Sequence, residues 1–293
     1  MPDKTPRKSY HEPVMLQEVI EALQIIPGGI YADMTFGGGG HSKAILLQLN
    51  KEGKLIAFDQ DEDAWKNAID DPRFLLVKEN FRHLQRFLKL YHMIPAEGIL
   101  ADLGVSSHQF DTAGRGFSMQ QNALLDMRMD RRQTLTAKDI LRSYDPAALQ
   151  EIFEQYGEVP NARTLAYRIV EARKTFPIET VAELTAIAGG VSRGNPARYL
   201  AQVFQALRIT VNDELNALRE MLEQSVSVLK PDGRLVIITF HSLEDRIVKE
   251  FMKNEKRLNI VYKKPLVPSF EEIKRNPRAR SAKLRVAKKG AVE

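Results

Sequence analysis

The chain has 293 residues, of which 43% are apolar and 28% charged, and its formal net charge is +5. This length can bury one large core or two modest ones. The absence of cysteine excludes disulfides, zinc ribbons, iron–sulfur clusters and a thiol nucleophile, and six scattered histidines give little support to a metal site. No apolar run is long enough for a membrane span or a signal peptide, so we expect a cytoplasmic protein without membrane contacts.

The positive charge is concentrated at one end of the chain. Residues 249–293 contain 14 Lys or Arg and 5 Glu, a net charge of +9, which leaves −4 for residues 1–248. A solvated terminal surface would explain this pattern. A basic segment beside a slightly acidic body more often contacts a polyanion such as nucleic acid, and we therefore expect that role.

The first part of the chain predicts alternating helices and strands. A helix near Pro13 precedes a strand at 30–34, a glycine turn at 37–40, a helix at 41–49, a strand at 54–59, a helix at 61–68, a strand at 74–77, a helix at 81–91 and a strand at 98–102. This alternation favours an α/β fold, with a parallel sheet covered by helices on both faces. Ligands of such sheets bind at the carboxyl ends of the strands.

The four glycines at 37–40 follow the first predicted strand. Glycine permits backbone angles that a Cβ atom forbids, and it lets a ligand lie against the main chain. The turn therefore favours a nucleotide-type cofactor, although a tight connection without a ligand is the alternative. If the cofactor explains the turn, Gly39→Val should block binding and leave the fold intact.

An aspartate ends each of three predicted strands. Asp59 lies where doubly wound folds place an acid for the ribose hydroxyls. Asp33 and Asp102 would repel the pyrophosphate of a dinucleotide, whereas both would suit a sulfonium and an ammonium group. The charges thus favour S-adenosylmethionine over NAD.

The alternation stops between residues 112 and 209, where we find helical patterns and a connector rich in Met and Arg. Helices are predicted at 161–174 and 196–207. The connector, residues 115–130, is expected to pack against the cofactor cleft. We predict an inserted helical domain at 112–209, within an α/β domain formed by residues 1–111 and 210–293.

The sheet pattern then resumes. A helix at 211–229 leads to the turn signal Pro231-Asp232-Gly233 and a strand at 234–240. Two closing strands are predicted at 258–262 and 283–286.

Several motifs resemble one known family over nearly the whole chain. They begin at Asp33, Asp102, Arg115, Leu125, Phe204, Phe240 and Asn276, and read DMTFGGGGHS, DLGVSS, RGFS, LDMRMD, FQALRI, FHSLEDR and NPRARS. The chain resembles the MraW, or ribosomal small-subunit RNA methyltransferase H, family of S-adenosylmethionine-dependent cytosine-N4 methyltransferases. The resemblance implies a class I, Rossmann-like methyltransferase sheet, mainly parallel, with an inserted helical domain. It also implies a cytidine substrate in the decoding region of 16S, small-subunit ribosomal RNA.

The resemblance further implies which residues contact the cofactor. They are Gly39, Gly40, His41, Asp59, Phe81, Asp102 and Gln109. On residue type alone, Phe81 could equally be a core residue at a helix start and His41 a helix cap.

The RNA should be held by the helical insert and the basic segment, since a class I sheet has few RNA contacts of its own. Four cations that fall within eight residues are expected to neutralise phosphates: Arg278, Arg280, Lys283 and Arg285. The expected partner is a late assembly particle of the small ribosomal subunit, and a homodimer is left open.

The reaction benefits from a group that accepts the proton of N4. Many amino-methyltransferases use an Asp/Asn-Pro-Pro-aromatic motif, whereas residues 102–107 here read Asp-Leu-Gly-Val-Ser-Ser. The candidates are Asp102, Ser106, His241 and Glu244, although a structural turn explains the last two equally well. Two competing hypotheses are an NAD-dependent oxidoreductase and an RNA-binding assembly factor that binds the cofactor without turnover.

Overall fold

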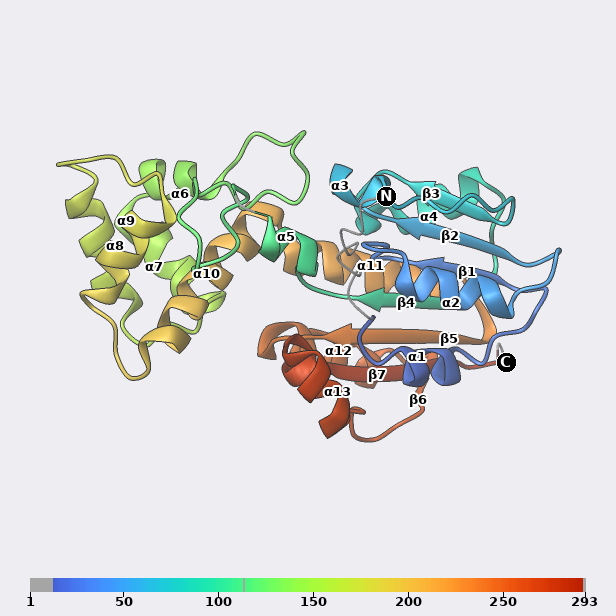
Figure 1. Cartoon of the computed structure of the whole chain (residues 1–293). Helices are drawn as coiled ribbons and strands as arrows, with labels where there is room; N and C mark the ends of the chain where they lie inside the picture. The colour runs from blue at the N-terminus through green and yellow to red at the C-terminus, as the bar shows by residue number, and fades with distance from the viewer. Residues whose placement is uncertain (1–12, 113, 292–293) are drawn as a thin grey trace. The chain divides into compact units, whose positions relative to one another are not determined.

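The computed structural model describes residues 13–112 and 114–291. It divides into two compact units (Figure 1). The sheet unit combines the chain up to Gly104 with the chain from Ala217, and the helical unit comprises Val105–Asn216. The insert expected at 112–209 lies within the helical unit, whose contacts extend further at both ends.

The sheet unit contains a seven-stranded, mainly parallel sheet in the order β3-β2-β1-β4-β5-β7-β6. Its strands are β1 (Ile30–Asp33), β2 (Lys54–Phe58), β3 (Phe74–Val77), β4 (Ala96–Asp102), β5 (Leu229–Thr239), β6 (Leu258–Ile260) and β7 (Lys283–Lys289). The first five strands run parallel, and β7 runs antiparallel to both β5 and β6.

Strand β1 is the point where the strand order reverses. Tyr31 pairs with Leu55 of β2 on one side and with Gly98 of β4 on the other. In doubly wound sheets a ligand crevice lies beyond the carboxyl ends of the strands at such a point. Asp33 and Asp102 end the two strands that meet there.

Helices cover both faces of the sheet because successive strand residues point to opposite sides. The helical segments of this unit are α1 (Leu16–Leu23), α2 (Gly40–Gln48), α3 (Glu62–Trp65), η1 (Phe81–His83), α4 (Leu84–Leu90), α11 (Glu214–Val228), α12 (Ser242–Asn254), α13 (Phe270–Arg275) and η2 (Pro277–Ser281). Leu55 belongs to the apolar cluster that includes α1 and α2, whereas Ile56 belongs to the cluster that includes α4, α11 and α12.

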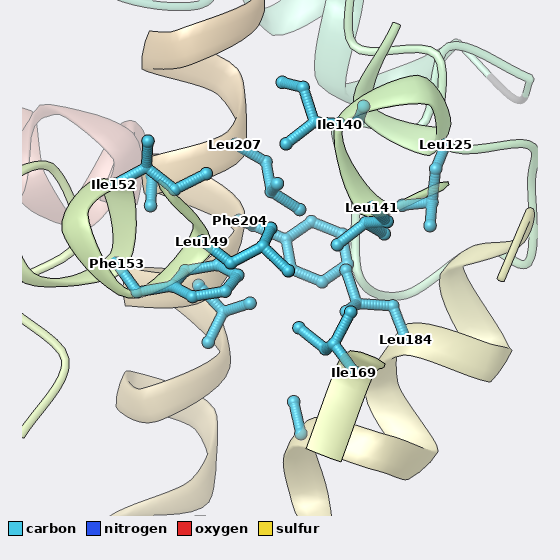
Figure 2. Packing of buried hydrophobic residues seen from close by; sticks show 14 of the residues in the cluster. Leu125, Ile140, Leu141, Leu149, Ile152, Phe153, Ile169, Leu184, Phe204 and Leu207 are labelled. Carbon is cyan, nitrogen blue, oxygen red and sulfur yellow. The ribbon is translucent and has the colours of Figure 1, made fainter. Parts of the chain in front are cut away.

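The helical unit has its own apolar core. Its helices are α5 (Ser107–Asp111), α6 (Ala137–Ser143), α7 (Pro146–Gln155), α8 (Ala162–Ala172), α9 (Val181–Gly189) and α10 (Pro196–Asn212). Figure 2 shows Leu141, Leu149, Ile169 and Phe204 converging from four of these helices. The connector expected against the cofactor cleft contributes Leu125 and Met127 to this core.

Several predicted boundaries are wrong for local reasons. Helix α10 continues to Asn212, and Asp213, with a left-handed φ of 50°, separates it from α11. The turn predicted at Pro231-Asp232-Gly233 lies inside β5, where the pairing with β4 shifts register and Asp232 has a φ of 65°. The last strand extends to Lys289 because it pairs with strands on both sides.

Within the described residues, we find no helix long and apolar enough to cross a membrane.

Adjacent leucines on α2 provide a direct test of the packing. Leu46 is 4% exposed and lies in the apolar cluster, whereas Leu47 is 84% exposed. Leu46→Ala should lower the free energy of unfolding by about 2 to 5 kcal/mol because it leaves a cavity. Leu47→Ala should change it by less than about 0.5 kcal/mol. Chemical denaturation measures both, and equal effects would contradict this orientation of the helix.

Candidate cofactor site at the carboxyl edge of the sheet

The glycine turn is shaped by the fold itself. Gly37 and Gly39 have positive φ angles of 51° and 74°. A Cβ atom at Gly39 would lie 3.0 Å from the Phe36 ring, and one at Gly40 would lie 2.9 Å from Pro13 Cγ. Gly39→Val should therefore also lower the stability of the fold, because the side chain would strain the backbone and displace Phe36.

Asp33 stabilises the glycine turn through hydrogen bonds to residues on both sides of it. Its buried carboxylate accepts hydrogen bonds from the Thr35 backbone N–H at 3.1 Å and from Ser42 Oγ at 2.6 Å. Burial raises the pKa of Asp33, and the hydrogen bond from Ser42 opposes that rise. Asp33 thus ties the end of β1 to the first turn of α2. From the sequence, Asp33 was expected only to contribute negative charge to the site. The hydrogen bonds from Thr35 and Ser42, which lie in the same motif, were not predicted.

Asp59 follows β2 and is held by two backbone donors. Its Oδ2 accepts from the Gly37 N–H and its Oδ1 from the Asp61 N–H, both at 2.8 Å. Burial raises the pKa of Asp59 to about 7, although both hydrogen bonds oppose the rise. Each oxygen has a second lone pair, so a fixed carboxylate can still accept from two ribose hydroxyls.

Phe81 lies at the start of η1 and packs, half-buried, against the apolar cluster of the sheet unit. The preceding residue, Asn80, caps η1 by accepting from the Arg82 N–H. Its side-chain amide also donates to Gln60 Oε1 at 2.8 Å. The loops after β2 and β3 are thereby joined, and this bond connects the segment of Asp59 to that of Phe81. Neither Asn80 nor Gln60 was predicted, because single amides carry no sequence signal.

His41 lies inside α2, whose N-cap residue is Gly39, so it is not a helix cap. Its Nε2 is 3.0 Å from the Val14 carbonyl oxygen, which can only accept, so Nε2 carries the hydrogen. Its Nδ1 is 3.8 Å from Asp102 Oδ2. Burial lowers the pKa of His41, while the charge of Asp33 opposes that shift.

Asp102 is the least satisfied acid of the site. Its backbone N–H donates to Thr35 Oγ1 at 2.7 Å, but its buried Oδ1 has no hydrogen-bond partner. The pKa of Asp102 is raised well above its usual range, first by burial and then by the charges of Asp33, Glu244 and Glu272. An unpartnered buried oxygen of this kind indicates a place for a ligand.

The three carboxylates together define the chemistry of the site. Asp33, Asp59 and Asp102 all have raised pKa values, and none forms an ion pair with Lys or Arg within the described part of the sheet unit. A ligand with a sulfonium and an ammonium group would supply the missing positive charge, and a pyrophosphate would add to the repulsion. The residues present therefore fit S-adenosylmethionine and disfavour a dinucleotide.

The other candidate acids and bases form helix caps. At the start of α12, the Glu244 N–H donates to His241 Nδ1, and Glu244 Oε2 accepts from the Phe240 N–H at 2.9 Å. At the start of α5, Ser106 Oγ accepts from the Gln109 N–H at 3.2 Å, and Gln109 Oε1 accepts from the Ser106 N–H at 2.9 Å. Both pairs are capping boxes that satisfy free helical N–H groups.

Comparison with known proteins gives matches over nearly the whole chain. The model of the MraW methylase family matches residues 8–290. Ribosomal RNA small subunit methyltransferase H of Flavobacterium psychrophilum is 51% identical over 290 residues, which cover 94% of this chain and all (100%) of that protein. The protein of the same name from Parabacteroides distasonis is 50% identical over 297 residues, with 96% of this chain and 97% of that protein covered.

The chain belongs to the MraW methylase family. The family predicted from the motifs is thereby confirmed, and so are the class I methyltransferase sheet and S-adenosylmethionine as the methyl donor.

The predicted cluster of RNA-binding cations divides into two pairs. Lys283 Nζ and Arg285 Nε bind the two oxygens of Asp245 at 3.0 and 2.7 Å, and the Arg285 side chain is only 12% exposed. These two residues join β7 to α12. Arg278 and Arg280 lie exposed on η2 and are the better placed to meet a phosphate.

Affinity for S-adenosylmethionine should depend on the ionisation of Asp59. A cationic donor with ribose hydroxyls favours the carboxylate form, so binding releases a proton, and affinity should rise with pH up to about 7 and then level off. Asp59→Ala should weaken binding above pH 7 by about 1.5 to 3 kcal/mol and abolish the Asp59-dependent rise. Titration calorimetry over pH, with Glu52→Ala as an exposed control, measures both effects. A pH profile unchanged by Asp59→Ala would exclude this acid from the site.

Proposed function

We propose that the protein transfers a methyl group from S-adenosylmethionine to N4 of a cytidine in the decoding region of 16S, small-subunit ribosomal RNA. The uncompensated carboxylates at the sheet edge support the donor. The name of the 50% to 51% identical relatives, ribosomal RNA small subunit methyltransferase H, supports the RNA substrate. The motif resemblance supports N4 as the acceptor atom. We place the reaction in the cytoplasm, on a late assembly particle.

When bound, S-adenosylmethionine supplies an electrophilic methyl group on a sulfonium. The N4 atom of cytosine is a weak nucleophile because its lone pair is delocalised into the ring. Aligning the two reacting atoms is therefore the larger part of catalysis, worth up to about 7 to 11 kcal/mol in well-oriented systems. The braced turn at Asp33 and the fixed carboxylate of Asp59 give this chain a rigid frame for such alignment.

Methylation of N4 forms one C–N bond and breaks one N–H bond, so a proton must leave. Among the four predicted acceptors, we assign the proton to Asp102. Ser106 Oγ accepts a helical N–H group, and Glu244 Oε2 accepts from the Phe240 and His241 N–H groups. His241 Nε2 is buried without a hydrogen-bond partner, but because Nδ1 accepts from the Glu244 N–H, the neutral ring carries its hydrogen on Nε2 and cannot accept a proton there. Asp102 Oδ1 has no hydrogen-bond partner, and the raised pKa makes its carboxylate a better base than an exposed aspartate.

The decisive experiment identifies the methylated atom. Small-subunit RNA treated with the enzyme and labelled S-adenosylmethionine should yield N4-methylcytidine at one site, read by mass spectrometry of nuclease fragments. Asp102→Asn should lower kcat by about 10² to 10⁴ fold because the proton acceptor is lost, and Asp70→Asn, an exposed control, should not. Donor affinity is measured in parallel.

Methyl transfer to another atom would contradict the substrate assignment, and an undiminished kcat in Asp102→Asn would contradict the acceptor. Donor binding without any methyl transfer would support the assembly-factor hypothesis. Nicotinamide reduction would support the oxidoreductase.

RNA affinity should depend on the exposed arginines of η2. Replacing both Arg278 and Arg280 with alanine should weaken RNA binding and lower the slope of log affinity against log salt by about 1.4, given about 0.7 for each single-strand phosphate released. Donor affinity should not change. The matched control replaces Lys51 and Lys54, two exposed cations at the opposite edge of the sheet. Lost donor binding with an unchanged salt slope would show that the two arginines brace the fold.

A further inference from the structure

Helix α8 of the helical unit has an outer side that the cofactor site does not use. Leu165, Ala166 and Ile169 point into the core, as Figure 2 shows for Ile169. The exposed side consists of Arg163, Thr164, Tyr167, Arg168 and Glu171. We call this side, with the segment 173–179 and the adjoining residues of α6, the α8 surface.

The α8 surface contains two hollows. One, of about 410 Å³, is lined by the five exposed α8 residues. The other, of about 560 Å³, is lined by Lys138, Asp139, Arg142, Arg173, Lys174, Thr175, Phe176, Pro177, Ile178 and Glu179. Lys174 Nζ lies 2.6 Å from Glu171 Oε1, and this ion pair joins the two hollows. The two hollows therefore lie on either side of this ion pair.

Positive charge gathers around the two hollows. Their linings hold six Lys or Arg and three Asp or Glu, whereas residues 105–216 as a whole hold thirteen of each. Arg173 is fixed, because its Nη1 donates to the carbonyl oxygens of Leu141 and Tyr144, both at 2.7 Å. Arg142 and Lys174 are in exposed ion pairs, which are weak enough to exchange their carboxylates for phosphates. The surface is thus complementary to a polyanion.

Two aromatic rings stand among these cations. Tyr167 is 50% exposed and Phe176 is 43% exposed. The Arg163 guanidinium carbon lies 5.9 Å from the centre of the Tyr167 ring, within the range of a cation–π contact. Unpaired bases stack on aromatic rings and on arginine planes, whereas the bases of a regular duplex are already stacked on each other. The cations and the exposed rings together therefore match RNA with unpaired bases.

We propose that the α8 surface binds single-stranded or irregular RNA, with arginines on the phosphates and with Tyr167 and Phe176 under unpaired bases. This proposal deepens the proposed function, on which it rests, by assigning a second RNA contact to the helical unit. It also gives the insert a task that the sheet unit does not perform. The target cytidine must leave its stack before N4 can react, and irregular RNA makes that step least costly.

The test compares single-stranded decoding-region RNA binding by the full-length wild-type chain and three α8-surface variants. Tyr167→Ala should weaken binding about tenfold through lost stacking, and Tyr167→Phe should retain it because the ring remains. Arg163→Ala with Arg168→Ala should lower the salt slope by about 1.4. The Lys51 and Lys54 double variant again controls for net charge, and thermal melting confirms folding.

The affinity for S-adenosylmethionine should be the same in all these variants. Unchanged RNA affinity in Tyr167→Ala, together with an unchanged salt slope in the arginine variant, would overturn the proposal. Equal losses in Tyr167→Ala and Tyr167→Phe would overturn the stacking role. Wild-type methyl transfer to small-subunit RNA is scored separately, so that failure of this surface is distinguished from failure of the proposed function.

Discussion

The site depends on negative charge that the protein holds at the carboxyl edge of its sheet without a matching cation. Burying a carboxylate is costly unless a partner or a hydrogen bond compensates it. Asp33 and Asp59 are partly compensated by backbone and hydroxyl donors, and Asp102 keeps an oxygen with none. The raised pKa values of all three aspartates reflect the free-energy cost of burial that these donors do not offset. A cationic methyl donor relieves this cost on binding, which links the stability of the site to its occupancy.

The same residue types serve structure and chemistry in this chain, and their hydrogen bonds distinguish the two uses. His241 with Glu244, and Ser106 with Gln109, occupy the N-cap and N3 positions of helices, where they satisfy backbone groups that would otherwise lack partners. Asp102 ends a parallel strand, and its side chain has no such task. Position within a secondary-structure element, more than residue type, is thus the basis of our proposal for the proton acceptor.

RNA recognition, as proposed, is divided between two compact units. The exposed arginines of η2 belong to the sheet unit, which also contains the proposed donor site, and the α8 surface belongs to the helical unit. Both combine positive charge with exposure, and the α8 surface adds an exposed aromatic ring within cation–π range of an arginine. Phosphate contacts position RNA, whereas stacking favours unpaired bases. The insert would thus supply preference for RNA shape.

The sequence alone determined the features that depend on near neighbours. The period of apolar residues predicted the β-α alternation and the helical insert, and it placed the aspartates at 33, 59 and 102 at strand ends. Because a parallel sheet brings such ends to one edge, these acids could be expected to lie near one another. Only the tertiary structure decided features whose partners are distant in the chain. Asp245 binds Lys283 and Arg285 across 38 and 40 residues, Gly40 lies against Pro13, and His41 connects Val14 to Asp102. Tertiary packing brings these groups together. A local sequence pattern cannot predict such contacts, because the partners are far apart in the chain and become neighbours only when it folds.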